Sequence, residues 1–357
     1  MNDALAVIVV THNAAAELGG LADALLGELE PDDEVVVVDN ASSDATVAVA
    51  RALDPRIALI ESAANVGFGA GCRAGVEATT APLVLLLNPD TRPQPGSLAR
   101  LRALAAEQPS WAAWQPAVML ADGRINTSGG VAHYLAFSWA GQCEQPASGL
   151  ADRPYETTFP SGAALVIRRT AWVELDGFED SYFLYGEDLD LGLRLWLAGQ
   201  RVGVEPRARV SHNYEFDKGR YKWYLLERNR WRTLLAVYPV GLLLALAPAL
   251  LASELGLLVI AARDGWLIAK LHAQLATVLG LPASLRRRRS VQAQRRVASA
   301  VFAAQLSASL DSPNLASLPR PLLRAQAGYW RLVRLLLRFP ARPRVSIARF
   351  AGGARRR

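Results

Sequence analysis

The stretch that most constrains the fold of this chain is residues 83–91, where five apolar residues are followed at once by Asn-Pro-Asp-Thr. Such a run is typical of a buried strand in a parallel sheet, which is covered on both faces. Pro89 cannot donate to a strand ladder, so we expect the strand to end near Asn88. Asp90 would then follow the carboxyl end of a central strand, where open α/β sheets bind ligands and a carboxylate can hold a divalent metal. Taken alone, the stretch also fits an ordinary Asp in a turn.

Three further apolar runs precede this one, at residues 5–11, 34–38 and 57–60. Between them lie helical patterns, the first over residues 14–29 with leucines on one face and the second with Ser42 or Ser43 as its expected cap. Strict alternation of strand and helix predicts a mostly parallel, doubly wound α/β sheet with helices on both faces.

Three polar residues follow the carboxyl ends of predicted strands, namely Thr11, Asp39 and Asp90. The carboxyl ends of parallel strands share one edge of the sheet, so we expect these side chains to line that edge. Asp39 is suited to accept hydrogen bonds from a nucleobase or a ribose. A turn or a helix cap is the alternative role for it.

A glycine-rich loop, residues 65–71, precedes the helix that leads to residue 78. Its spacing differs from G-x-G-x-x-G and it follows the third strand instead of the first, so a Rossmann dinucleotide site is not predicted. We expect these glycines to let the backbone approach a ligand or a neighbouring helix closely.

Four motifs now stand in order: Val-Val-Thr-His-Asn at 9–13, Val-Val-Asp-Asn-Ala-Ser-Ser-Asp at 37–44, Asn-Val-Gly-Phe-Gly-Ala-Gly at 65–71 and Leu-Asn-Pro-Asp at 87–90. Together they resemble the family 2 glycosyltransferases, in particular a rhamnosyltransferase-like branch, over roughly residues 5–235. The resemblance implies a GT-A fold, a nucleotide-sugar donor, a divalent metal (Mg²⁺ or Mn²⁺) and inversion at the anomeric carbon.

The resemblance also implies site residues. Asp39 would bind the nucleotide base, and Asp90 would be the last Asp of the metal-binding Asp-x-Asp, with Asn88 in place of the first. Arg73 stands where Asn is common, so that contact is not carried over. The implied donor-binding residues are Thr11, Asn13, Asp39, Asn40, Asn65, Gly67, Phe68, Gly69, Asn88 and Asp90.

The second half of this region is expected to hold the acceptor side. Residues 112–160 are interpreted as sheet-edge strands and a loop, with most of their aromatic residues in the core, and residues 159–167 as another buried strand. An amphipathic helix opens at Glu187, and acids in a first helical turn commonly serve only the helix dipole. By the resemblance, however, Glu187 and Asp188 match a catalytic Glu-Asp pair with Asp188 as general base.

His212 follows the last predicted strand, and the resemblance suggests it as a metal or diphosphate ligand. A solvent-facing His after a strand is the alternative. A carboxylate base and a metal together suit a single displacement, in which the acceptor hydroxyl loses a proton while the diphosphate leaves. A retaining double displacement stays open on the sequence alone.

The last third of the chain is apolar and then basic. Residues 233–262 are nearly all apolar but interrupted by Pro248 and Glu254, which favours a kinked or re-entrant interfacial segment over a true membrane span. Arginines at 286–289 and 295–296 form a basic cluster, and residues 321–339 predict a basic amphipathic surface helix, with packing on the catalytic domain as the alternative. We therefore divide the chain into a catalytic domain (1–232), a membrane-associated segment (233–305), a linker (306–320) and a basic helix with a tail (321–357).

Net charge is +6 and mean hydropathy +0.13, which fits attachment to an anionic membrane surface. The sequence thus predicts an inverting glycosyltransferase on the cytoplasmic face of a membrane, peripheral or monotopic. It would move a sugar, with rhamnose as one candidate, to a lipid-linked saccharide or a cell-surface polysaccharide precursor. A sugar nucleotidyltransferase is the alternative, although residues 12–15 supply no basic glycine-rich loop for a triphosphate. A nucleic-acid-binding protein is the other class; no recognition motif accompanies the arginines, so nucleic acid is not an expected partner.

Overall fold

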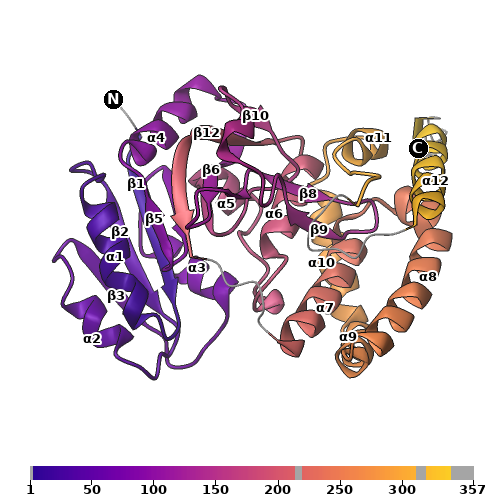
Figure 1. The fold of residues 1–357 in the computed structure, drawn as a ribbon, viewed down its shortest axis with the longest axis horizontal. Coiled ribbons are helices and arrows are strands. Elements are labelled where there is room, and N and C mark those ends of the chain that lie inside the picture. Colours follow the sequence, from indigo (N-terminus) through magenta and orange to yellow (C-terminus); the bar gives the residue numbers. More distant parts are fainter. Residues whose placement is uncertain (1–2, 214–218, 311–318, 339–357) are drawn as a thin grey trace, which may run out of the picture.

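The computed structural model describes residues 3–213, 219–310 and 319–338. Its main feature is a ten-stranded sheet flanked by helices, joined to a helical region at the other end of the molecule (Figure 1). The strands of this sheet are β1 (Leu5–Thr11), β2 (Glu34–Asp39), β3 (Ile57–Glu61), β4 (Leu83–Leu87), β5 (Thr91–Pro93), β6 (Trp111–Met119), β7 (Ile125–Thr127), β10 (Tyr155–Glu156), β11 (Ala164–Arg168) and β12 (Arg201–His212). Strands β8 (Gly130–Ala132) and β9 (Ser138–Ala140) form a separate antiparallel pair.

The sheet runs in the order β10-β12-β6-β11-β4-β1-β2-β3, with β5 paired to β12 and β7 to β6. Strands β4, β1, β2 and β3 are parallel, β11 is antiparallel to both of its neighbours, and β12 runs parallel to β6. The predicted doubly wound α/β sheet is confirmed, and the four strands that carry the nucleotide-edge motifs are its parallel part.

Helices cover both faces, because side chains along each strand alternate between two cores. Leu5, Val7 and Val9 of β1 pack under α1, α2 and α4, whereas Ala6 and Ile8 pack under α3, α5 and α6. The helices of this part are α1 (Ala15–Leu26), α2 (Thr46–Arg51), α3 (Phe68–Glu77), α4 (Ser97–Glu107), α5 (Arg169–Glu174) and α6 (Glu187–Leu197), with short 3₁₀ turns η1 (Ala147–Gly149) and η2 (Asp180–Tyr182).

Two local predictions are wrong. Helix α2 begins at Thr46, and Asp44, not Ser42 or Ser43, accepts a hydrogen bond from its first N–H. Residues 111–119 form the buried central strand β6 instead of an edge. Pro116 concealed this strand, since proline cannot donate to a ladder, but its partner β12 has a bulge directly after the residue opposite it.

The helical region shares a core with the catalytic part. It consists of α7 (Arg220–Val237), α8 (Val240–Arg263), α9 (Leu267–Leu279), α10 (Leu281–Ala293), α11 (Ser299–Ala303) and α12 (Arg320–Arg338). Leu189 and Leu193 of α6 belong to the same buried cluster as Leu242, Leu246 and Phe302. The proposed boundary at residue 232/233 therefore falls inside α7 and does not separate two cores.

The predicted linker, residues 306–320, is also partly packed. Leu306 is buried, and the N–H of Ser307 donates to the carbonyl of Ala132. Residues 311–318 lie outside the described part of the chain. Helix α12 confirms the predicted segment, and its Trp330 stacks on Tyr134 with ring centroids 4.8 Å apart, so one side of it packs on the enzyme.

The basic cluster of residues 286–296 largely turns inward, contrary to the prediction of a lipid-facing patch. Arg287 pairs with Asp190 and Glu179, each at 2.5 Å, and Arg288 donates to two carbonyls of the α7 end. Arg295 bonds Val297 and Ser299, and Arg296 pairs with Glu174. Within this cluster, Arg286 and Arg289 are exposed and make no hydrogen bond or ion pair with another described residue.

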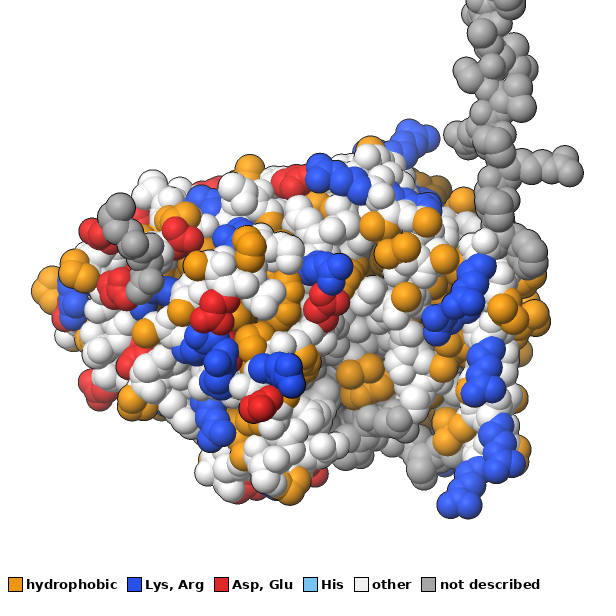
Figure 2. Space-filling model, turned by 90° about the horizontal axis from the view of Figure 1, so that it is seen from above, with side chains coloured by type: hydrophobic (Ala, Val, Ile, Leu, Met, Phe, Trp, Pro, Cys, Tyr) orange, Lys and Arg blue, Asp and Glu red, His pale blue; other side chains and the backbone are white. Residues whose placement is uncertain are grey.

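One end of the molecule is apolar and basic at its surface. Helix α8 buries Leu242, Leu246 and Leu250 but exposes Leu244, Leu251 and Val259. In Figure 2 a row of basic side chains runs along the end that α8 and α12 form in Figure 1, with hydrophobic side chains among them. Within the described residues, α8 is also the one helix long and apolar enough to cross a membrane, and 11% of its most apolar window is buried.

Candidate functional site

The first half of the site is the turn between β4 and β5, which carries Asp90. Strand β5 pairs with the end of β12 in a register that sets Thr91 opposite His212. As a result, His212 Nε2 lies 3.1 Å from Asp90 Oδ1. Arg92 braces the turn by donating to the carbonyls of Pro89, Thr91 and Glu17.

Asp90 and His212 together fit a divalent metal. Asp90 Oδ1 is buried yet accepts no hydrogen bond from any described residue, which leaves an unneutralised anionic oxygen facing an imidazole nitrogen. Carboxylate oxygen and imidazole nitrogen suit Mn²⁺, and the carboxylate suits Mg²⁺. Within the described residues no group of three or more His, Cys, Asp and Glu side chains gathers that could hold a metal ion.

A cavity of about 650 Å³ opens beside this pair. Asp90 and His212 line it together with Glu17, Arg92 and Arg209. The other predicted donor residues do not line it. The cavity therefore covers the turn that carries Asp90 and not the carboxyl ends of β1 and β2, where the nucleotide edge is predicted.

The nucleotide edge lies at the ends of β1 and β2, where the parallel register sets Thr11 beside Asp39. Asp39 is buried and accepts hydrogen bonds from Thr11 Oγ1 (3.3 Å), Ser42 N (3.0 Å) and Ser42 Oγ (2.5 Å). Its carboxylate therefore holds the turn after β2 in place. Asp39 Oδ2 accepts from one N–H and can accept a further hydrogen bond. Asn13, at φ 54°, accepts from Ser43 in the same turn.

The glycine-rich loop is held by Asn40. Its amide Nδ2 donates to the Gly67 carbonyl (3.0 Å) and its Oδ1 accepts from Val66 N (3.0 Å). Gly67 has φ 89°, and a side chain there would collide with the Phe183 backbone, whose carbonyl accepts from Phe68 N at 2.7 Å. Asn40 and Gly67 thus position the loop against residues 180–185, and the donor contact that the resemblance implied for them stays a prediction.

The remaining predicted donor residues have local roles here. Asn65 Oδ1 accepts from Gly67 N, Gly69 lies against Phe178, and Asn88 accepts through its carbonyl from Thr91 Oγ1. Arg73 points away from the nucleotide edge and pairs with Asp176 and Asp180, so it braces the loop that precedes η2.

Asp188 forms the other half of the site. It lies in the first turn of α6, and its Oδ2 accepts from Gly162 N at 3.1 Å while Oδ1 accepts from Leu189 N at 2.7 Å. The adjacent Ala163 carbonyl accepts from Asn88 N at 3.0 Å. Two consecutive residues, Gly162 and Ala163, therefore connect the end of β4 to the Asp188 carboxylate, which places the Asp90 turn and Asp188 on one edge of the sheet.

Glu187 and Asp188 differ in their surroundings. Burial, the Asp188 charge and the Asp190 charge raise the pKa of Glu187 to about 8, and Glu187 Oε2 has no hydrogen-bond partner among the described residues. Burial also raises the pKa of Asp188, but its two N–H donors oppose that shift. At neutral pH the raised pKa favours a protonated Glu187, whereas the two N–H donors favour the ionised form of the partly exposed Asp188.

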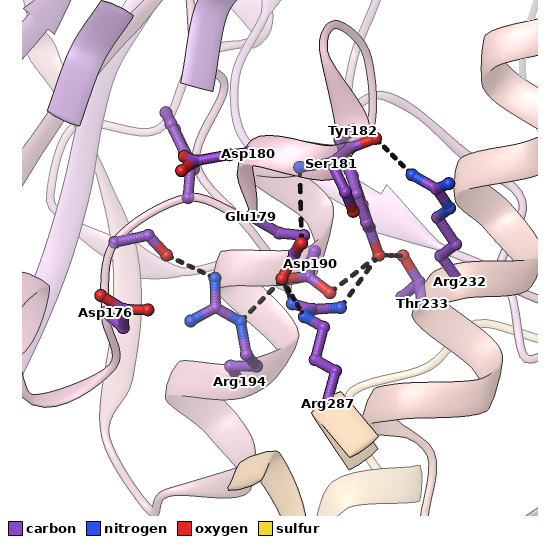
Figure 3. Close-up of polar contacts among 12 residues, drawn as sticks. Asp176, Glu179, Asp180, Ser181, Tyr182, Asp190, Arg194, Arg232, Thr233 and Arg287 are labelled. Atoms are coloured by element: carbon purple, nitrogen blue, oxygen red, sulfur yellow. Dashed lines mark hydrogen bonds and ion pairs between the residues drawn. The ribbon is translucent and has the colours of Figure 1, made fainter. Parts of the chain in front are cut away.

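A buried polar network lies behind Asp188 and was not predicted (Figure 3). Asp190 accepts from Arg194 Nε (2.7 Å), Arg287 Nη2 (2.5 Å) and the Tyr182 hydroxyl (3.0 Å), which also contacts Thr233. Burial alone would raise the pKa of Asp190, yet Arg287 and Arg194 hold it at about 2. The Asp190–Arg194 spacing of four residues is readable from sequence, whereas Arg287 comes from a helix almost a hundred residues away.

Asn229 of α7 is a second unpredicted residue. Its buried Nδ2 lies within hydrogen-bond distance of three carbonyls, those of Tyr182, Leu184 and Tyr185. The loop it holds contains Phe183 and Tyr185 at positive φ and ends at Gly186, also at positive φ, directly before the acidic pair. Because such backbone is strained for side-chain-bearing residues, an external clamp is needed to hold it.

Comparisons with known proteins agree with this geometry. Residues 6–125 match the family model described as Glycosyl transferase family 2, and residues 83–282 match Glycosyl transferase family group 2. The N-acetylglucosaminyl-diphospho-decaprenol L-rhamnosyltransferase of Mycobacterium tuberculosis (strain ATCC 25618 / H37Rv) is 30% identical over 249 residues, which cover 62% of this chain and 79% of that protein. Rhamnosyltransferase WbbL of Escherichia coli (strain K12) is 34% identical over 76 residues, 20% of this chain and 29% of that protein.

Among solved structures, S. aureus TarS 1-349 in complex with UDP superimposes with a TM-score of 0.51 at 16% identity, over 94% of this chain and 90% of that one. GalNAc-T7 with UDP, GalNAc and Mn²⁺ gives a TM-score of 0.56 at 15% identity, over 66% and 48%. At these identities the structural likeness shows the fold alone, and it is the fold that the four motifs predicted.

Proposed function

The chain belongs to glycosyltransferase family 2, and from that premise we propose that it is an inverting, metal-dependent enzyme that moves a sugar to a lipid-linked saccharide. The observation that carries the proposal is the bridge that Gly162 and Ala163 form between the Asp90 turn and Asp188. It supports a donor diphosphate at one end and an acceptor hydroxyl at the other, on the same edge of the sheet.

Asp188 is the proposed general base. Its carboxylate is oriented by Gly162 N and Leu189 N, so in its ionised form it can accept the proton of the acceptor hydroxyl as that oxygen attacks the anomeric carbon. The bond from the anomeric carbon to the diphosphate breaks in the same displacement, which inverts the configuration. Glu187, kept neutral by burial, adds no second negative charge beside the base.

Asp90 and His212 are the residues proposed to hold the metal. When bound, Mg²⁺ or Mn²⁺ would neutralise the negative charge of the leaving nucleoside diphosphate. Thr11 and Asp39 would contact the nucleoside, because they lie at the ends of the adjoining parallel strands.

Rhamnose is the proposed sugar and a lipid-linked diphosphate saccharide the proposed acceptor, on the strength of the two rhamnosyltransferase relatives. The exposed apolar residues of α8, α9 and α12, with the exposed arginines of α12, support attachment to an anionic membrane surface on the cytoplasmic side. The partial burial of α8, and the pairing of its Glu254 with Arg230 and Lys270, favour a helix lying on the enzyme over a free membrane span.

The proposal is tested by incubating the full chain with a panel of nucleotide-sugars, rhamnose donors included, and a lipid-linked diphosphate N-acetylglucosamine acceptor, with and without Mg²⁺ or Mn²⁺. We expect metal-dependent transfer, and a product whose anomeric configuration, read by NMR, is opposite to that of the donor. Retention of configuration would overturn the single displacement, and full transfer in the presence of a chelator would overturn the metal.

A further inference from the structure

Two arginines of α7, Arg228 and Arg232, lie one helical turn apart against the loop that leads to the catalytic carboxylates. Arg228 Nη2 donates to the carbonyls of Ser181 (3.2 Å) and Tyr182 (2.7 Å). Arg232 Nη1 donates to the same Ser181 carbonyl, and Figure 3 shows it reaching across from α7 to this loop. Both guanidinium groups are thus fixed at one place, with their side chains partly exposed.

Neither arginine of this pair has a carboxylate within 4.0 Å among the described residues, a property that it shares with Arg92 and Arg288, which donate to backbone carbonyls. Arg194, Arg230 and Arg287 each form a short ion pair with Asp or Glu. Burial lowers the pKa of Arg232, and the charge of Arg228 lowers it further. The charge of Glu179 acts in the opposite direction but forms no ion pair with either arginine. Two guanidinium groups held close together suit the binding of a phosphate.

Donor groups remain for such an anion. Arg228 Nη1 and Arg232 Nε and Nη2 make no hydrogen bond to a described residue. The planar fork of a guanidinium matches the oxygens of a phosphate. Neither arginine lines the cavity beside Asp90, so an anion bound here is distinct from the diphosphate at the proposed metal turn.

An apolar surface adjoins the pair. A Cβ built on Gly280, between α9 and α10, would lie 3.9 Å from Arg232 Nη2. Four apolar side chains around Gly280 are exposed, namely those of Val278, Leu279, Leu281 and Leu285. Cationic groups beside exposed hydrocarbon suit an amphiphile that carries a phosphate head on an aliphatic chain.

We propose that Arg228 and Arg232 bind the diphosphate of the lipid-linked acceptor, and that the apolar residues around Gly280 contact the start of its hydrocarbon chain. This inference rests on the proposed function, which supplies the acceptor class. The loop to which the two arginines donate ends at Gly186, directly before α6. A diphosphate held by these arginines would therefore lie beside the segment that presents Asp188. The acceptor would then be recognised by its lipid diphosphate as well as by its sugar.

The test measures binding of farnesyl diphosphate to the full chain by titration calorimetry in EDTA, so that no metal remains at Asp90. The variant is Arg228→Gln with Arg232→Gln, and the matched control is Arg286→Gln with Arg289→Gln, which removes the same charge from the exposed face of α10. We expect the first pair to weaken binding about tenfold or more and the control to change it less than about twofold. Farnesol should bind far more weakly than farnesyl diphosphate to the unaltered chain.

Equal binding by both variants, or an equal loss in both, would overturn the site. Inorganic pyrophosphate binding as tightly as farnesyl diphosphate would overturn the role of the apolar residues. If the Gln variant unfolds at a different temperature from the parent, the test is repeated with Arg228→Lys and Arg232→Lys. These substitutions keep the positive charges but lose the planar guanidinium groups, so binding should still weaken. If the Arg228 and Arg232 variants transfer sugar to a lipid diphosphate with an unaltered KM for that acceptor, this site alone is overturned. If the unaltered chain binds farnesyl diphosphate but transfers no sugar, the proposed function alone is contradicted.

Discussion

Charged side chains have different surroundings at the carboxyl edge of the sheet and in the helical region behind it. At the edge, Asp90 and Asp188 remain partly exposed and have no arginine or lysine partner among the described residues. Behind the edge, Asp190 of α6 is paired with two arginines, one of them from the helical region, and Glu227 and Glu254 of the helical region are paired with Arg230 and Lys270.

The difference separates charges that act on a ligand from charges that hold a scaffold. A carboxylate that must take a metal or a proton has to keep its charge available, whereas a buried structural charge is tolerated only when it is paired. The two kinds meet on α6, where Asp188 and Asp190 are two residues apart and face the site and the core respectively.

The largest expected effect comes from the edge. Asp90→Ala should abolish sugar transfer and metal-dependent nucleotide binding, because the proposed metal loses its carboxylate ligand. Asp32→Ala, an exposed turn residue, serves as the control and should leave both intact. Unchanged turnover in Asp90→Ala would remove the metal assignment and with it the contrast between the two regions.

The helical region should respond in stability. Arg287→Ala removes one of two cations from buried Asp190, so we expect the free energy of unfolding to fall by about 1.5–3 kcal/mol. Its neighbour Arg286 is exposed and makes no hydrogen bond or ion pair with a described residue, so Arg286→Ala should be close to neutral. Urea unfolding of the two variants measures the difference, and equal effects would show that the inward-facing pair is not structural.

Membrane attachment should depend on charges that are not used internally. Arg331 and Arg334 of α12 are exposed, and replacing both with Gln should weaken sedimentation with anionic liposomes about tenfold. High salt should release the full chain only in part, because salt screens the arginines but not the apolar residues. Protein that stays in solution with anionic liposomes at low salt would contradict the attachment.

The pH dependence of turnover should reflect the titration of a carboxylate at the sheet edge and not of the paired charges behind it. The pKa of Asp188 is raised, and a protonated carboxyl cannot accept the acceptor proton, so kcat/KM should fall as pH drops through that pKa. Glu187→Gln should retain this acid limb because Glu187 is already protonated at neutral pH. Loss of the limb in Glu187→Gln would make Glu187 the titrating base.

The parts that could be predicted from sequence are those whose determinants are close together in the chain. Leucine and valine runs predicted β1, β2 and β4, and the polar residues at or just after their carboxyl ends predicted Thr11, Asp39 and Asp90 on one edge. The contact between Asp90 and His212 needed the antiparallel pairing of β5 with β12, although His212 was already a candidate.

The rest depends on partners distant in sequence. The arginine run at 286–289 is indistinguishable from a solvated basic patch until α10 packs beside α6 and meets Asp190. Residues 233–262 likewise resemble a membrane segment, because the residues that share a buried cluster with Leu242 and Leu246, such as Trp330 of α12, are distant in sequence. Asn229 carries no local signal for the three carbonyls it holds.

The central claim is that Asp188 accepts the acceptor proton on the edge that Asp90 shares, and Asp188→Asn tests it most directly. The substitution keeps the shape of the side chain but removes its basicity, so turnover should fall by about 10²-fold or more while the affinity for nucleotide-sugar stays the same. Both quantities are measured on one preparation, by transfer to the lipid-linked acceptor and by calorimetric titration with the donor. A loss of donor affinity as large as the loss of turnover would contradict the claim and make Asp188 a donor-site or structural residue.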